Sequence, residues 1–264
     1  MPWPFRKSSF RKIQNWLWIL LLIGLWELIR ISAGVNPLIM PSFGVILGTL
    51  IRGIIRGELL GRWILSLGVV CSGLLAGAGI AVILTMLSGA AKSAESFLSL
   101  LSSLMHPLPG LALMPLVILW FGIGYSAVFF VMLHAVIWPV YVNLESGRRS
   151  LAPAWSLYAR NLGLNGCRKF FRIILPGSFP HLISGIRTGW ARSWRAFIAA
   201  EMVFGAVGSR GGLGWQLFEG RVMMDTPALY SALLAVMMTG MAVEDLILGR
   251  WESTVRKKWG EESS

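Results

Sequence analysis

Uncharged apolar stretches long enough to cross a lipid bilayer constrain this chain more than any other feature. The segment 63–87 contains no charged residue, and a spanning helix needs about 20 apolar residues because the hydrocarbon core is about 30 Å thick. Only 14% of the residues are charged, against about 25% in an average soluble domain. The chain therefore has too little polar surface to face water on all sides, and we predict an all-α integral membrane protein.

Further apolar stretches predict about six transmembrane helices, at 16–32, 63–87, 97–121, 127–144, 181–207 and 227–248. The third contains several prolines, so we expect its helix to kink or break. Such a break survives in a membrane where protein or a cavity covers the freed backbone groups. Basic residues precede the first stretch, as in a signal peptide, but Glu27 and the lack of a small-x-small cleavage site favour a retained anchor.

We expect one transmembrane domain over 1–264, without a second domain. Its parts are a basic N-terminus (1–15), the first span with an outer amphipathic helix (16–62), a five-helix core (63–250) that includes a polar loop (145–180), and a tail (251–264). The amphipathic helix is predicted within 41–62, which is too short and too charged to span but has apolar residues at helical spacing.

The basic residues are distributed unevenly between the two sides of these spans. Fifteen of the 24 Lys and Arg residues lie on the side that holds both termini and the 145–180 loop, whereas six lie on the other side. Lys and Arg are retained on the cytoplasmic side of membranes. Both termini and the loop are therefore expected in the cytoplasm.

The 145–180 loop has the signals of two short helices with a sharp corner. Pro153 suits the first turn of the first helix, and Gly163, between two leucines, predicts a left-handed helix end. Asn165 can cap the second helix, which we expect to stop at Pro176. The loop either rests on anionic lipid or docks a partner, because a stiff helix–corner–helix can transmit force.

Five loop residues complete a spaced pattern: Ala159, Gly163, Ile173, Leu175 and Pro176. This pattern resembles the cytoplasmic E-A-A-x-x-x-G-(x)9-I-x-L-P motif in permease subunits of bacterial binding-protein-dependent ABC importers, in the group that handles nitrate, aliphatic sulfonates and taurine. Leu157 and Tyr158 replace the leading Glu and Ala. Further matches extend the resemblance over about 41–250, and they lie at 107–116, 118–124, 185–187, 200–202 and 212–214.

The resemblance implies a type I importer permease of the bacterial cytoplasmic membrane. It would form a dimer, of two identical chains, on two cytoplasmic ATPase subunits that receive the loop as a coupling helix. A substrate-binding protein would deliver a small solute, for which sulfonate, taurine and nitrate are the candidates. ATP and Mg²⁺ would belong to the ATPase; the chain itself has no G-x-x-x-x-G-K-[ST] motif, and we expect no catalytic residue, cofactor or metal in it.

Charged residues interrupt the predicted fifth span. Buried charges in lipid are costly and usually face a cavity or a partner. Arg187 is expected to extend to the cytoplasmic interface. Arg192 and Arg195, with Glu201 beyond them, either line the translocation path or a dimer contact, where they would attract an anion, or pair with Glu201 or with backbone carbonyls.

Two other classes of function remain open, a membrane-embedded enzyme and an uncoupled channel or carrier. An enzyme of this kind needs clustered acids or histidines. The 12 acidic residues form no D-x-x-D pair, and His106 and His134 each lack a second ligand at helical spacing, so helix packing is their expected role. In an uncoupled carrier the basic loop would have no partner.

Overall fold

The computed structural model describes residues 6–151, 153–206 and 211–259, which fold into helices and turns without a β-strand in those ranges. The predictions for 1–5, 260–264 and Arg210 lie outside the described residues. The elements are α1 (Arg6–Ser32), α2 (Phe43–Ile55), α3 (Glu58–Ser88), α4 (Lys92–Met105), η1 (Gly110–Leu113), α5 (Met114–Phe121), α6 (Tyr125–Ser150), α7 (Pro153–Asn161), α8 (Gly166–Lys169), η2 (Phe170–Ile174), α9 (Leu175–Gly177), α10 (Phe179–Phe204), α11 (Leu213–Val222), α12 (Thr226–Met241), η3 (Ala242–Gly249) and α13 (Arg250–Lys258).

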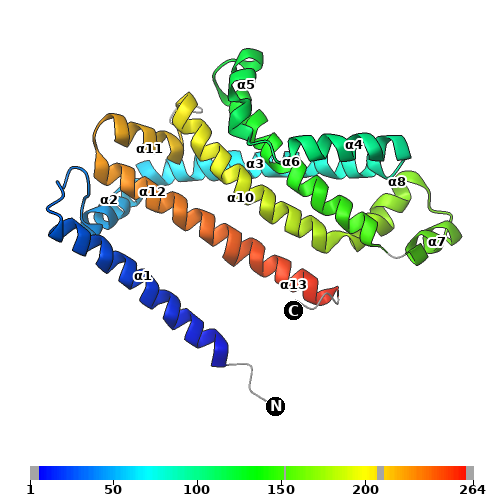
Figure 1. Ribbon diagram of the computed structural model, residues 1–264, viewed down its shortest axis with the longest axis horizontal. Coiled ribbons are helices and arrows are strands. Elements are labelled where there is room, and N and C mark those ends of the chain that lie inside the picture. Colours follow the sequence, from blue (N-terminus) through cyan, green and yellow to red (C-terminus); the bar gives the residue numbers. More distant parts are fainter. Residues whose placement is uncertain (1–5, 152, 207–210, 260–264) are drawn as a thin grey trace.

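The long helices α3, α6 and α10 form the centre of the fold (Figure 1). α10 packs along α6, and both pack against α3. Glycine permits this approach, because a Cβ on Gly77 would lie 2.7 Å from the side chain of Val136, and one on Gly185 would lie 2.9 Å from the Cα of Val140. Small residues at helix contacts serve the same purpose in many membrane bundles.

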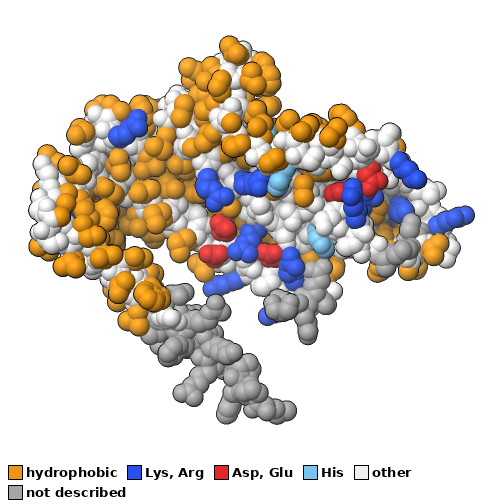
Figure 2. Space-filling model, viewed as in Figure 1, with side chains coloured by type: hydrophobic (Ala, Val, Ile, Leu, Met, Phe, Trp, Pro, Cys, Tyr) orange, Lys and Arg blue, Asp and Glu red, His pale blue; other side chains and the backbone are white. Residues whose placement is uncertain are grey.

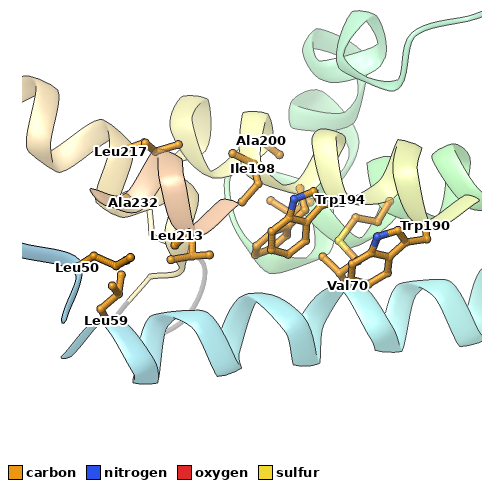
Figure 3. Packing of buried hydrophobic residues seen from close by; sticks show 14 of the residues in the cluster. Leu50, Leu59, Val70, Trp190, Trp194, Ile198, Ala200, Leu213, Leu217 and Ala232 are labelled. Atoms are coloured by element: carbon orange, nitrogen blue, oxygen red, sulfur yellow. The ribbon is translucent and has the colours of Figure 1, made fainter. Parts of the chain in front are cut away.

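Tryptophans of α10 fill the space between α10 and α3. The rings of Trp190 and Trp194 stack with their centroids 5.6 Å apart, and Figure 3 shows them above Val70 of α3. The indole nitrogen of Trp194 donates to the Val236 carbonyl oxygen of α12 at 3.3 Å. Buried apolar packing therefore joins three elements that are distant in the sequence.

The prediction of an all-α membrane protein is confirmed. Among the described residues, three helical segments are long and apolar enough to cross a bilayer: α3, α6 and the run 226–258, which joins α12, η3 and α13. The bent pair α4 and 110–121 makes a fourth if it counts as one span. α1 and α10 lie where the first and fifth spans are predicted, but they are not among these segments. The number six thus stays a prediction, as does the division into parts.

The predicted break in the third span is present. α4 ends at Met105, and the segment 110–121 leaves it at an angle of 92°; in Figure 1, α5 projects from the bundle. The break lies against α6, because a Cβ on Gly110 would lie 3.2 Å from the Val131 side chain. α6 therefore lies beside the break at Gly110, and Arg192 of α10 donates to the His106 carbonyl at 3.0 Å, so one of the freed groups has a partner within the protein.

The amphipathic helix predicted within 41–62 is α2. It buries Ile46 and Leu50 and packs against α12 and α3. The backbone turns at Gly57, with φ +81°, and α3 begins at Glu58, so the second long helix starts earlier than predicted. The position of α2 at the outer interface of a bilayer stays a prediction.

Candidate functional site

The predicted corner of the basic loop is confirmed. α7 ends in a Schellman motif, in which the Leu164 amide donates to the Ala159 carbonyl at 2.9 Å and the Gly163 amide donates to the Arg160 carbonyl at 3.0 Å. Gly163 has φ +64°, a conformation that glycine adopts without steric cost. We call residues 153–177 the knob.

The predicted stop at Pro176 is wrong. The chain stays helical through α8, the π-helix η2 and α9, and α10 begins two residues after α9. The Leu175 amide donates to the Phe170 carbonyl, five residues back, so the wider π-turn tolerates the proline that follows, whose missing N–H would interrupt an α-helix. Asn165 does precede α8, but its side chain makes no capping hydrogen bond.

Two parts of the chain, the C-terminal segment 250–259 and α6, hold the knob where it joins α10. The indole nitrogen of Trp259 donates to the Pro176 carbonyl at 3.2 Å. The Phe179 ring lies near those of Trp251 and Trp259, with centroids 6.2 and 5.8 Å away. On the other side, α6 approaches so closely that a Cβ on Gly147 would lie 2.8 Å from His181. The knob is thus continuous with α10 and fastened to α13 and α6.

The surface of the knob combines apolar and basic side chains. Of the residues in the family-like pattern, Ala159 is buried, Ile173 and Leu175 are half-buried, and Gly163 and Pro176 are exposed. More than half of each large apolar side chain is exposed for Trp155, Leu157, Tyr158, Leu162 and Phe171. Exposed arginines lie among them at positions 160, 168 and 172. A projecting surface of this composition suits a protein partner, since aromatic residues and arginine are enriched at interfaces.

An ion-pair network that sequence reasoning missed joins α4 to α6. Glu145, whose side chain is 8% exposed, accepts from Arg148 at 2.6 Å and from Arg149 at 2.9 Å. Glu95 of α4 lies 2.8 Å from Arg148 and 3.2 Å from Arg149. The spacing of Glu145 to the two arginines is a signal in the sequence, whereas the contribution of Glu95 depends on the fold.

Arg187 is held by acidic partners rather than extended alone towards an interface. Its guanidinium lies 3.1 Å from Glu252 and 3.1 Å from Asp245. Glu252 also accepts from the Ser184 hydroxyl at 2.6 Å. These contacts bind the first half of α10 to η3 and α13.

Arg192 and Arg195 lie between two grooves. The first, of about 310 Å³, we call the histidine groove; its lining includes both arginines, the 106–111 break of the third span, and His134 of α6. The second, of about 350 Å³, also has both arginines, together with Arg187, Glu244 and Glu252. Figure 2 shows basic side chains beside a histidine near the centre of this face, with acidic side chains below them.

The histidine groove brings together residues that are far apart in the sequence. Arg192 donates from Nη1 to the His106 carbonyl at 3.0 Å, and its Nη2 lies 3.3 Å from His106 Nε2. Arg195 is exposed. The expectation that His106 and His134 serve only for packing missed this arrangement, and no spacing in the sequence could have revealed it.

Glu201 lies apart from the two arginines with which it was grouped. Its side chain is fully buried and accepts from the Gly212 amide at 2.7 Å and from the Gly214 amide at 3.0 Å. The Leu213 amide between them donates to the Ser66 hydroxyl at 2.9 Å. Glu201 is therefore a cap for the start of α11 and lines neither groove. The sequence holds one signal for this role, the two glycines, because a Cβ on Gly214 would lie 2.8 Å from that of Glu201.

The helical bundle, its bent third span and the projecting basic knob define a polytopic α-helical membrane protein. A family model described as "Binding-protein-dependent transport system inner membrane component" matches residues 73–257. The chain belongs to this family, which consists of transport permeases rather than enzymes, and the resemblance found in the sequence is confirmed.

Individual relatives support the same group. The chain is 27% identical to the putative aliphatic sulfonates transport permease SsuC of Bacillus subtilis, over 92% of this chain and 88% of the relative. It is 22% identical to the taurine transport system permease TauC of Escherichia coli, over 92% and 87%. It is 28% identical to the nitrate import permease NrtB of Synechocystis, over 69% and 65%.

Proposed function

We propose that this chain is the permease subunit of an ATP-driven importer that passes a small anion, of the sulfonate, taurine or nitrate kind, into the cytoplasm. The observation that carries the proposal is the knob, a stiff projection that is continuous with α10. In the proposed assembly two identical chains contact two ATPase subunits through their knobs, and ATP and Mg²⁺ are bound by those subunits. A binding protein delivers the solute on the opposite side, and both termini face the cytoplasm.

The knob residues have distinct parts in this proposal. Gly163 makes the corner, and Ala159, which is buried, supplies the carbonyl that accepts from the Leu164 amide. Leu157 and Tyr158, exposed where the family motif has Glu and Ala, would contact the ATPase through apolar and aromatic surface. Arg192 and Arg195 remain our candidates for the lining of the translocation path.

The test is purification of the tagged chain from its native membrane, with co-purifying proteins identified. An ATPase in equal copy number is the expected result. Gly163→Val should lose it, because a β-branched residue disfavours the left-handed corner, whereas Gly163→Asn should retain it because Asn tolerates this conformation.

A matched control is Gly57→Val. Gly57 is also left-handed, with φ +81°, and like Gly163 has open space where a Cβ would be, but it lies between α2 and α3. It should keep the ATPase despite similar backbone strain. A chain that purifies without an ATPase, or a Gly163→Val variant that retains one, would count against coupling through the knob and favour an uncoupled carrier.

A further inference from the structure

The histidine groove is positively charged without a compensating carboxylate. Its ionisable lining residues in the described structure are two arginines and two histidines, whereas the neighbouring groove includes Glu244 and Glu252. Its volume of about 310 Å³ equals the share of about ten waters in the liquid. The groove therefore has space for a small solute, and its charge favours an anion.

Hydrogen bonds from Arg192 hold the His106 side of the groove. A guanidinium only donates, so in the contact between Arg192 Nη2 and His106 Nε2 the imidazole nitrogen must accept. The ring proton of neutral His106 then lies on Nδ1, which is buried inside the protein, away from the open space of the groove, and has no hydrogen-bond partner. The His134 ring lies near the Met105 carbonyl, yet neither of its nitrogens has a hydrogen bond of standard geometry.

The two arginines supply hydrogen-bond donors beside the two histidines of the groove. The His106 carbonyl fixes the direction of the Arg192 guanidinium, while the exposed Arg195 side chain forms no ion pair or side-chain hydrogen bond with a residue of the described ranges. Guanidinium groups match the paired oxygens of oxyanions and bind them with charge-assisted hydrogen bonds. We propose that the groove formed by His106, His134, Arg192 and Arg195 is a binding site for the oxyanion group of a small solute. This inference rests on the proposed function, because the bound solute is taken to be the transported one.

The position of the groove separates this solute from a lipid phosphate. Arg192 is 13 residues from the start of α10 and 12 from its end, which corresponds to about 20 Å of helix on either side at 1.5 Å per residue. The wall opposite is the break of the third span, which lies against α6. To reach the groove, a headgroup anchored at either membrane surface would have to extend to the middle of α10, where that helix packs along α6.

The experiment is equilibrium binding to the purified chain, with any ATPase that accompanies it, in nanodiscs of zwitterionic phosphatidylcholine. The probes are methanesulfonate and nitrate, measured by titration calorimetry. Dimethyl sulfone serves as the neutral control, because it resembles methanesulfonate in size but lacks the charge. We expect saturable binding of at least one anion and none of the sulfone. Binding of neither anion, or equal binding of the sulfone, would overturn the proposal without need of any variant.

Variants then locate the site. The double variant Arg192→Gln, Arg195→Gln should weaken anion binding at least tenfold, and Arg192→Lys, which keeps the charge but loses the fork, should weaken it less. Arg221→Gln is the matched control, since Arg221 is an exposed arginine above the Phe218 ring and lines neither groove; it should leave the affinity unchanged. An unchanged affinity in a double variant that remains monodisperse would place the anion elsewhere.

Two further arms separate the possible failures. If phosphatidylglycerol in the nanodisc abolishes anion binding, an anionic lipid headgroup occupies the groove and the solute site is wrong. Co-purification of the ATPase is scored in the same preparations. Anion binding without an ATPase would support the anion site in the histidine groove and count against the proposed function. An ATPase without anion binding would support the proposed function and count against the anion site.

Discussion

Glu201 provides the sharpest stability test in this fold. Its buried carboxylate accepts from the Gly212 and Gly214 amides at 2.7 and 3.0 Å and thereby joins α10 to the start of α11. A hydrogen bond to a charged group contributes about 1.5–3 kcal/mol. Glu201→Ala removes both acceptors and leaves two buried N–H groups, so the free energy of unfolding should fall by about 3–6 kcal/mol. Glu201→Gln keeps one acceptor and should lose about half as much.

The assay is unfolding by SDS in mixed micelles, followed by helix content, which returns a free energy for each variant. Glu219→Gln is the control. Glu219 pairs with Arg62 at 2.8 Å, but its side chain is 40% exposed, so its loss should cost only about 0–1 kcal/mol. The reasoning is refuted if Glu201→Ala unfolds within about 1 kcal/mol of the unsubstituted protein, or if Glu219→Gln has the larger effect.

Two further predictions concern packing. Gly185→Ala places a Cβ 2.9 Å from the backbone of α6 and should lower the free energy of unfolding by about 1–3 kcal/mol. Gly68→Ala, which has open space at its Cβ, should be neutral or stabilise the protein by up to about 1 kcal/mol. Thermal unfolding in detergent checks the order of the two variants, and equal effects would contradict the close contact at Gly185. Trp259→Ala removes the hydrogen bond to the Pro176 carbonyl and the ring contact with Phe179, so the backbone amides of Leu175, Gly177, Ser178 and Phe179 should exchange faster with deuterium while those of α3 do not change. Unaltered exchange would show that α13 does not hold the knob.

Local features could be predicted from the sequence because neighbouring residues determine them. The Gly163 corner depends on the left-handed backbone that glycine accepts, and the break of the third span depends on prolines that lack an N–H. Composition was sufficient for the membrane class. Pro176 was misjudged because the effect of a proline depends on the turn before it, and the π-turn of η2 was not visible in the pattern of residue types.

The grooves and the caps could not be predicted because they depend on contacts across the fold. His106 meets Arg192 only because the chain bends by 92° after α4 and α10 passes beside that bend. Glu201 binds the amide of Gly212, eleven positions later in the chain. No periodic pattern of residue types predicts a contact across that interval. An arginine or glutamate in an apolar span indicates a buried partner, but the partner itself comes from the packing.

The joining of the knob to α10 and α13 makes α10 a lever arm. The Pro176 carbonyl, just before α10, accepts from Trp259, and Arg187 in the first half of α10 pairs with Glu252 of α13, so the knob, the start of α10 and the C-terminal segment are joined to one another. From Arg187, the last of these contacts, to Arg195 the helix runs about 12 Å, so a tilt of about 10° beyond that point displaces Arg195 by about 2 Å. Under the proposed function, a small rocking motion of the knob would therefore move Arg195, and with it one side of the histidine groove, by a distance of that order.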